Sequence, residues 1–165
     1  MTDIQLSKHF KLSEFTKSGT ATKYGIDNTP PLNVISNLQY LCKEILEPLR
    51  EWVNEPIVIS SGYRCPQLNS HPEVRGATKS QHLTGEAADI RIPWIQSSNG
   101  SNSSSSSKVQ DLEKGRRYLD FILDNVRFDH LIWEHDRYGH YWIHVSFKRD
   151  DSKNRQLYTP NLLKK

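Results

Sequence analysis

Cysteine is scarce in this chain, and long apolar runs are absent. The two cysteines, Cys42 and Cys65, form no CxxC pair. The sequence leaves a disulfide between them as one alternative, but isolated thiols more often indicate a reducing compartment or side chains that only pack in the core. Residues 1–10 have no signal-peptide pattern, and no stretch is apolar enough to span a membrane. We therefore expect synthesis in the cytoplasm without a signal peptide and no membrane insertion, so that any action outside the cell would follow release by another route.

A concentrated basic stripe is also missing. The formal net charge is +3 and the sequence pI is about 8.8, but lysine and arginine are scattered along the chain. This distribution argues against a nucleic-acid partner, whereas a mildly positive field suits an anionic polymer. With 165 residues, of which 35% are hydrophobic, the chain is long enough for one packed domain, 1–165. Nothing in the sequence fixes the oligomeric state, and we expect a monomer.

Hydrophobic periodicity divides the chain into alternating helices and strands. It predicts an α+β fold, a small antiparallel central sheet flanked by helices. Apolar spacing predicts helices over 33–53, kinked by Pro48 near Glu44, and over 108–126. Strands are expected at 56–59 and 87–92 and in a hairpin of 130–134 and 141–147. The remaining segments are an N-terminal arm expected to pack on the core (1–31), a long loop (62–85), a flexible Ser/Asn-rich insertion (96–107) and a loosely packed C-terminal tail (148–165).

Two segments combine imidazole and carboxylate side chains at the ends of predicted elements. His82 precedes Asp89 by seven residues, Gly85 lets the backbone turn between them, and His144 lies on the polar face of the hairpin's second strand. Two histidines and a carboxylate are a ligand set of catalytic zinc sites, which keep a position open for water. The alternative is a plain hydrogen-bonded pair of His82 and Asp89.

The motifs around these residues resemble the zinc D-alanyl-D-alanine carboxypeptidase and endopeptidase family, whose fold is shared with hedgehog signalling domains. The resemblance rests on Ser61-Gly-Tyr-Arg64 with Asn69, on the run from Ser80 to Ile90, and on Trp142-Ile-His144-Val. The segments His9 to Phe15 and Ile26 to Pro31 are similar to the bacterial and phage branch that includes endolysins. The resemblance implies one Zn²⁺ held by His82, Asp89 and His144, and cleavage of peptidoglycan stem peptides.

The general base is where this chain departs from the family. Many relatives carry Glu or Asp three residues before the second histidine, a position that here is Tyr141. We predict that Glu134 takes this role, which requires it to pair with Trp142 across the hairpin; pairing with Tyr141 would turn it into the other layer. His140 and Asp136 are fallback candidates, and Glu134 as a solvated carboxylate at a strand end is the alternative.

Three further positions are predicted to bind substrate, together with an aromatic wall. Arg64 could clamp a substrate carboxylate or the developing oxyanion, or form a structural ion pair with a loop acid. Ser80 and Gln81 could bind substrate or orient His82, or only hydrogen-bond backbone. Trp142 shares a strand face with His144 and could wall the cleft.

Two functions therefore compete. The first is a zinc metallopeptidase of peptidoglycan, endolysin-like, cutting stem peptides as a D,D-carboxypeptidase or as an endopeptidase. The second is a non-catalytic zinc-containing binding or assembly module on the same fold, because this fold does not guarantee turnover.

Overall fold

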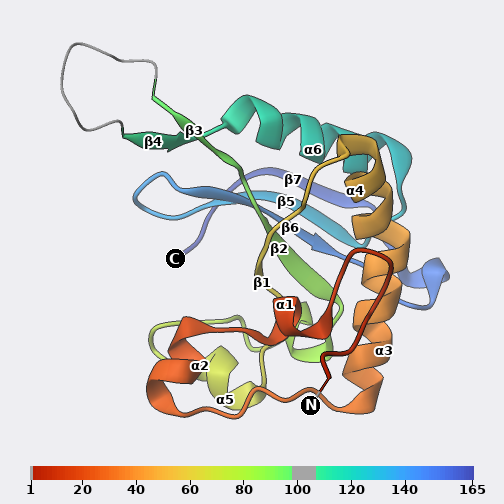
Figure 1. The fold of residues 1–165 in the computed structure, drawn as a ribbon, viewed down its shortest axis with the longest axis vertical. Helices are drawn as coiled ribbons and strands as arrows, with labels where there is room; N and C mark the ends of the chain where they lie inside the picture. The colour runs from red at the N-terminus through yellow and green to blue at the C-terminus, as the bar shows by residue number, and fades with distance from the viewer. Residues whose placement is uncertain (1, 98–106) are drawn as a thin grey trace.

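The computed structural model describes residues 2–97 and 107–165 and has the predicted α+β architecture, a single domain built on a central sheet (Figure 1). The strands and helices, in chain order, are α1 (Leu12–Thr16), α2 (Gly19–Tyr24), α3 (Leu32–Leu41), a π-helical turn (Cys42–Leu46), α4 (Glu47–Val53), β1 (Ile59–Ser61), α5 (Pro66–Ser70), a 3₁₀ turn (Gln81–Thr84), β2 (Ala87–Arg91), β3 (Trp94–Gln96), β4 (Lys108–Gln110), α6 (Leu112–Asn125), β5 (His130–His135), β6 (Tyr141–Ser146), a second 3₁₀ turn (Asp151–Lys153) and β7 (Leu157–Leu163). Among the described residues, no helix is both long and apolar enough to cross a membrane.

The central sheet has the strand order β1-β2-β6-β5-β7. Its first four strands pair antiparallel, as predicted, and β7 pairs parallel to β5. The prediction of a loosely packed tail at 148–165 is therefore wrong, because residues 157–163 complete the sheet. The sequence Leu157-Tyr-Thr-Pro-Asn-Leu-Leu163 does not alternate cleanly, and Pro160 has no N–H to donate, which suits an edge strand.

The helices cover one face of this sheet, with α6 above it and the α3–α4 column beside it in Figure 1. Alternate strand residues, among them Ile90, Leu131 and Val145, are fully buried in one core cluster with residues of α3 and α6. The neighbouring positions on each strand face the other way, because side chains of a strand alternate. The candidate site residues occupy that second face.

The long helix predicted over 33–53 forms, with a change of winding in its middle. The π-helical turn at 42–46 lies just before Pro48, and the backbone N–H of Glu47 donates to the carbonyl of Cys42. Pro48 has no N–H for the carbonyl of Glu44, four residues earlier, so a regular α-helical ladder is interrupted where the sequence predicted it.

One predicted strand and one predicted helix begin later in the chain than expected. The first strand begins at Ile59 instead of residue 56, although Val58 already accepts a bond from the backbone of Arg91. The helix expected from residue 108 begins at Leu112, because the Asp111 carboxylate caps it by accepting from the Lys114 backbone. Residues 108–110 instead pair with β3, and most of the predicted flexible insertion (98–106) lies outside the described residues.

The N-terminal arm packs on the core through Phe10 and Phe15, both buried and in edge-to-face contact. The arm carries two short helices, α1 and α2, which lie with α5 beneath the sheet in Figure 1. Phe15 also accepts a backbone bond of 2.7 Å from Tyr63, next to Arg64. The arm thereby supports the segment that leads from β1 into the site.

Candidate metal centre

Three potential ligands converge on the polar face of the sheet. Asp89 on β2 pairs directly with His144 on β6, and the 3₁₀ turn brings His82 beside both. Asp89 Oδ1 lies 3.3 Å from His82 Nε2 and 3.0 Å from His144 Nδ1. The three ligand atoms all lie within 4.8 Å of one another. The structure therefore brings together the three residues that the sequence predicted, although β2 is buried on both faces and Asp89 is only 8% exposed.

The backbone around His82 is fixed by its neighbours. Ser80 Oγ caps the turn by accepting from the His82 backbone at 3.3 Å, and Gly85 ends the turn in the left-handed region at φ +73°. A Cβ on Gly85 would lie 2.7 Å from the backbone oxygen of Val34. Gly85 is thus required both for the turn predicted there and for close packing against α3.

The protonation pattern of the cluster suits a cation. Nδ1 of His82 lies 2.6 Å from the carbonyl of Gly62, which needs a donor, so Nε2 is left unprotonated toward Asp89. Burial lowers the pKa of His82 and favours this neutral form. Burial alone would raise the pKa of Asp89, but the two imidazoles outweigh it and hold the carboxylate ionised. Two imidazoles and a carboxylate, close together and largely buried, fit a zinc ion.

Glu134 lies on the same face of the sheet as the ligands. It pairs with Trp142 across the β5–β6 hairpin, which is the register that the sequence analysis favoured. Its Oε2 accepts a hydrogen bond of 3.1 Å from Trp142 Nε1. Burial raises the pKa of Glu134, and the charge of Asp89 adds to this effect. A half-buried carboxylate with a raised pKa beside a metal site is a candidate proton acceptor.

Tyr141 belongs to the other layer. Its ring stacks on that of Trp133, with centroids 5.2 Å apart, and Trp133 is buried in the core. The residue three positions before His144 has the opposite strand parity, so it faces the core here. The fallback candidate His140 hydrogen-bonds Asp136 in the hairpin turn, and neither lines the metal pocket.

Arg64 lies beside the metal cluster without an acidic partner. Its guanidinium donates to Ser61 Oγ at 3.4 Å and to Ser80 Oγ at 3.3 Å. Among the described residues no carboxylate lies within ion-pair distance of it, and its buried Nε donates to no group. Burial lowers the pKa of Arg64, while the negative charges of Asp89 and Glu134 oppose this effect. The structural ion pair considered from sequence does not form in the described part of the chain.

Gln81 and Trp142 make contacts that the sequence did not predict. Gln81 Nε2 donates to Asp129 Oδ2 at 2.9 Å, and Asp129 also accepts from Arg155 at 2.8 Å and 3.0 Å. Through the buried Asp129 carboxylate, this network links the turn that carries His82 to the start of β5. Trp142 donates a hydrogen bond to the Glu134 carboxylate and does not itself line the pocket. Whether Gln81, Ser80 or Trp142 touches substrate stays a prediction.

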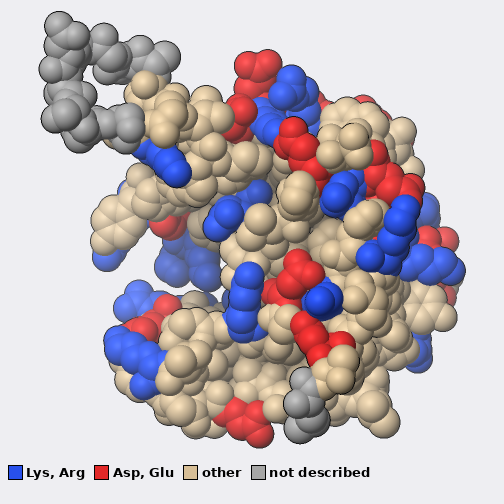
Figure 2. All heavy atoms as spheres, viewed as in Figure 1, with Lys and Arg blue, Asp and Glu red and all other residues tan. Residues whose placement is uncertain are grey.

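The ligand cluster opens into a pocket of about 410 Å³. His130 and Ile132 line it with Glu134, a set that strand alternation along β5 could have identified. Its other wall is the C-terminal segment Leu162–Lys165, which sequence reasoning missed because it treated the tail as loose. Figure 2 shows a hollow on the side where the C-terminus lies in Figure 1, bordered by lysine and arginine atoms.

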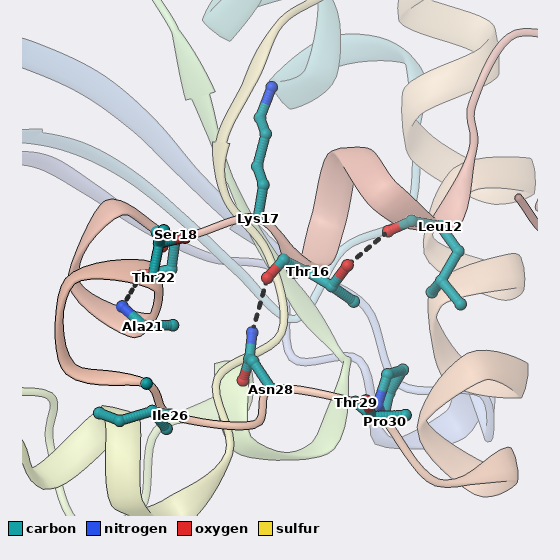
Figure 3. A pocket seen from close by; sticks show the side chains of 11 residues that line it. Leu12, Thr16, Lys17, Ser18, Ala21, Thr22, Ile26, Asn28, Thr29 and Pro30 are labelled. Carbon is teal, nitrogen blue, oxygen red and sulfur yellow. Dashed lines mark hydrogen bonds between the residues drawn. The ribbon is translucent and has the colours of Figure 1, made fainter.

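A second hollow, of about 500 Å³, lies between α1, α2 and the loop 25–30 (Figure 3). Asn28 spans it by donating to the carbonyl of Thr16 at 2.9 Å. Its lining includes no histidine, cysteine or carboxylate side chain. This hollow therefore holds no set of metal ligands.

An α+β domain with two histidines and an aspartate converging on an open pocket has the general construction of a metal-dependent hydrolase. A family profile described as Peptidase M15 matches residues 8–122, and the chain belongs to this family of zinc-dependent peptidases. The match includes Arg64, His82 and Asp89; His144 and Glu134 lie beyond it and join the site through strand pairing. A comparison with curated proteins found no match.

Proposed function

We propose that the protein is a zinc-dependent peptidase that hydrolyses peptide bonds in peptidoglycan stem peptides, as a D,D-carboxypeptidase or an endopeptidase of endolysin type. The supporting observation is the convergence of His82 Nε2, Asp89 Oδ1 and His144 Nδ1 at the base of an open pocket. Family membership supplies the peptidase class, and the basic pocket lining favours an anionic peptide. The protein would act on the cell wall after release, as a monomer.

In this mechanism five polar residues of the pocket act on the metal or on the substrate. His82, Asp89 and His144 would hold one zinc ion, which when bound supplies an activated water and polarises the scissile carbonyl. Glu134 accepts the proton of the attacking water and returns it to the leaving amine. Arg64, held by the hydroxyls of Ser61 and Ser80, binds a substrate carboxylate or the developing oxyanion.

A metal assay combined with a muropeptide digest tests the proposal. Purified protein should bind about one zinc per chain and release products from peptidoglycan, and His82→Ala should lose both. His140→Ala is a matched control, since this histidine is exposed and hydrogen-bonds only Asp136 in the turn. Bound zinc without cleavage of any wall preparation would favour the non-catalytic module. Protein that stays free of metal in excess zinc would contradict both functions.

A further inference from the structure

A smaller hollow, of about 230 Å³, adjoins the metal pocket. Arg64 and Lys164 line both hollows, so the two lie side by side. The smaller one extends from Arg64 along Ser60 and Ser61 of β1 to Lys17 and the start of α2. An extended peptide bound at the metal would therefore meet this smaller hollow.

The smaller hollow has a positive net charge. It is lined by three cations, Lys17, Arg64 and Lys164, and by one carboxylate, Glu73. Glu73 already accepts hydrogen bonds of 2.7 Å from Lys23 and from Tyr24, so its charge is matched. None of the three cations has a carboxylate within ion-pair distance among the described residues. An anionic group is what this arrangement lacks.

Two cations that line the smaller hollow, Lys17 and Lys164, are held by different elements. Figure 3 shows the Lys17 side chain extending away from Ala21, Ile26 and Asn28. Lys164 follows β7, and its backbone N–H donates to the carbonyl of His135 at 2.8 Å, which fixes it beside the pocket. Arg64 also lines this hollow, and its buried Nε has no hydrogen-bond partner. The positions are therefore set by the fold and do not depend on flexible tails.

We propose that this hollow is a second substrate subsite, which binds a free carboxylate of the substrate at a residue other than those joined by the cleaved bond. The inference rests on the proposed function and adds a substrate preference to it. Lys17 and Lys164 supply the charge for this carboxylate, and Arg64 connects it to the metal pocket. Amidation of that carboxyl group on the substrate removes the charge and the preference.

The test compares two stem peptides that differ only in whether one acidic residue carries a free or an amidated carboxyl group. For zinc-loaded wild-type protein, KM should be lower for the free form. Lys17→Gln should raise KM for the free form about two- to fivefold, with KM for the amidated form unchanged. Lys17 is exposed, so the change leaves the fold intact. Lys8→Gln removes the same charge outside the hollow and should leave both values unchanged.

Combining Lys17→Gln with Lys164→Gln should abolish the preference, and raised salt should weaken it in wild-type protein. Equal discrimination by wild type and the double variant would overturn the subsite while leaving the peptidase intact. If wild-type protein cleaves neither peptide, the proposed function fails. Equilibrium binding of the same two peptides then tests whether the subsite exists. Preferential binding of the free form that disappears in Lys17→Gln would then support it, and equal binding would refute it.

Discussion

Replacing Glu134 by glutamine tests the proton transfer of the mechanism with the smallest change of shape. Among the described residues that line the metal pocket, Glu134 is the one side-chain carboxylate besides the ligand Asp89. Loss of a general base typically slows a reaction about 10²- to 10⁴-fold. We therefore expect kcat/KM of Glu134→Gln to fall by this factor, which corresponds to about 2.7 to 5.4 kcal/mol of transition-state stabilisation.

The same variant should not lose stability. A glutamine oxygen can still accept the hydrogen bond from Trp142 Nε1. Burial raises the pKa of Glu134 in the folded state, so the folded protein binds this proton more tightly than the unfolded chain does. In metal-free protein the free energy of unfolding therefore falls as pH rises from the unfolded glutamate pKa through the raised folded value. Glu134→Gln should lack this fall and be at least as stable as wild type at pH 7.

The assays are zinc content, urea denaturation of chelated protein at several pH values, and hydrolysis of a muropeptide. Asp136→Asn and His140→Gln are the controls, because both residues are fallback candidates for the base and neither lines the pocket. They should retain activity. A zinc-loaded Glu134→Gln that keeps more than about a tenth of wild-type kcat/KM would refute the assignment, and loss in Asp136→Asn alone would transfer the role.

Two further predictions concern the scaffold. Gly85→Ala combines a positive φ with a Cβ only 2.7 Å from the Val34 carbonyl oxygen, so it should cost about 2 to 4 kcal/mol of unfolding free energy in a urea titration and weaken zinc binding. The control Gly139→Ala has a positive φ but open space around the Cβ, so it should cost only about 1 to 2 kcal/mol in the same titration. Equal losses in the two variants would contradict the argument from close packing at Gly85. Burial alone would raise the pKa of Asp129, but hydrogen bonds from Arg155 lower it, so this carboxylate stabilises the fold above its unfolded pKa and the effect is lost as pH falls below about 4. Asp129→Asn should thus cost about 1.5 to 3 kcal/mol at pH 7, because it removes the charge that strengthens the hydrogen bonds from the half-exposed Arg155 to this buried position; an unchanged denaturation midpoint would contradict this.

Strand alternation explains why so much of the site could be predicted from sequence. It placed Asp89 and His144 on polar strand faces, and burial of the opposite face excludes a one-residue slip between β2 and β6, which would turn the apolar residues outward. Alternation leaves two registers for Glu134, and the structure has the predicted one, in which Glu134 pairs with Trp142. Gly85 could be assigned because few residues other than glycine tolerate a left-handed turn before a buried strand.

Long-range contacts explain what could not be predicted. The strand β7 is added in parallel to β5, and its residues Leu162–Lys165 reach the pocket only through that pairing. No local pattern encodes a parallel partner far away in the chain. The bond from Gln81 to Asp129 is equally non-local, since it joins residues 48 positions apart.

The geometry of the sheet explains how Tyr141 can stand where many relatives carry a carboxylate. A residue three positions before His144 on a regular strand faces the core, and Tyr141 stacks there on Trp133. A carboxylate at that position would be buried in an apolar layer unless the strand were distorted. A carboxylate on β5 at the register of Trp142 reaches the pocket face without any distortion, and Glu134 occupies that position. The base can therefore come from the neighbouring strand, so the tyrosine is no argument against hydrolysis.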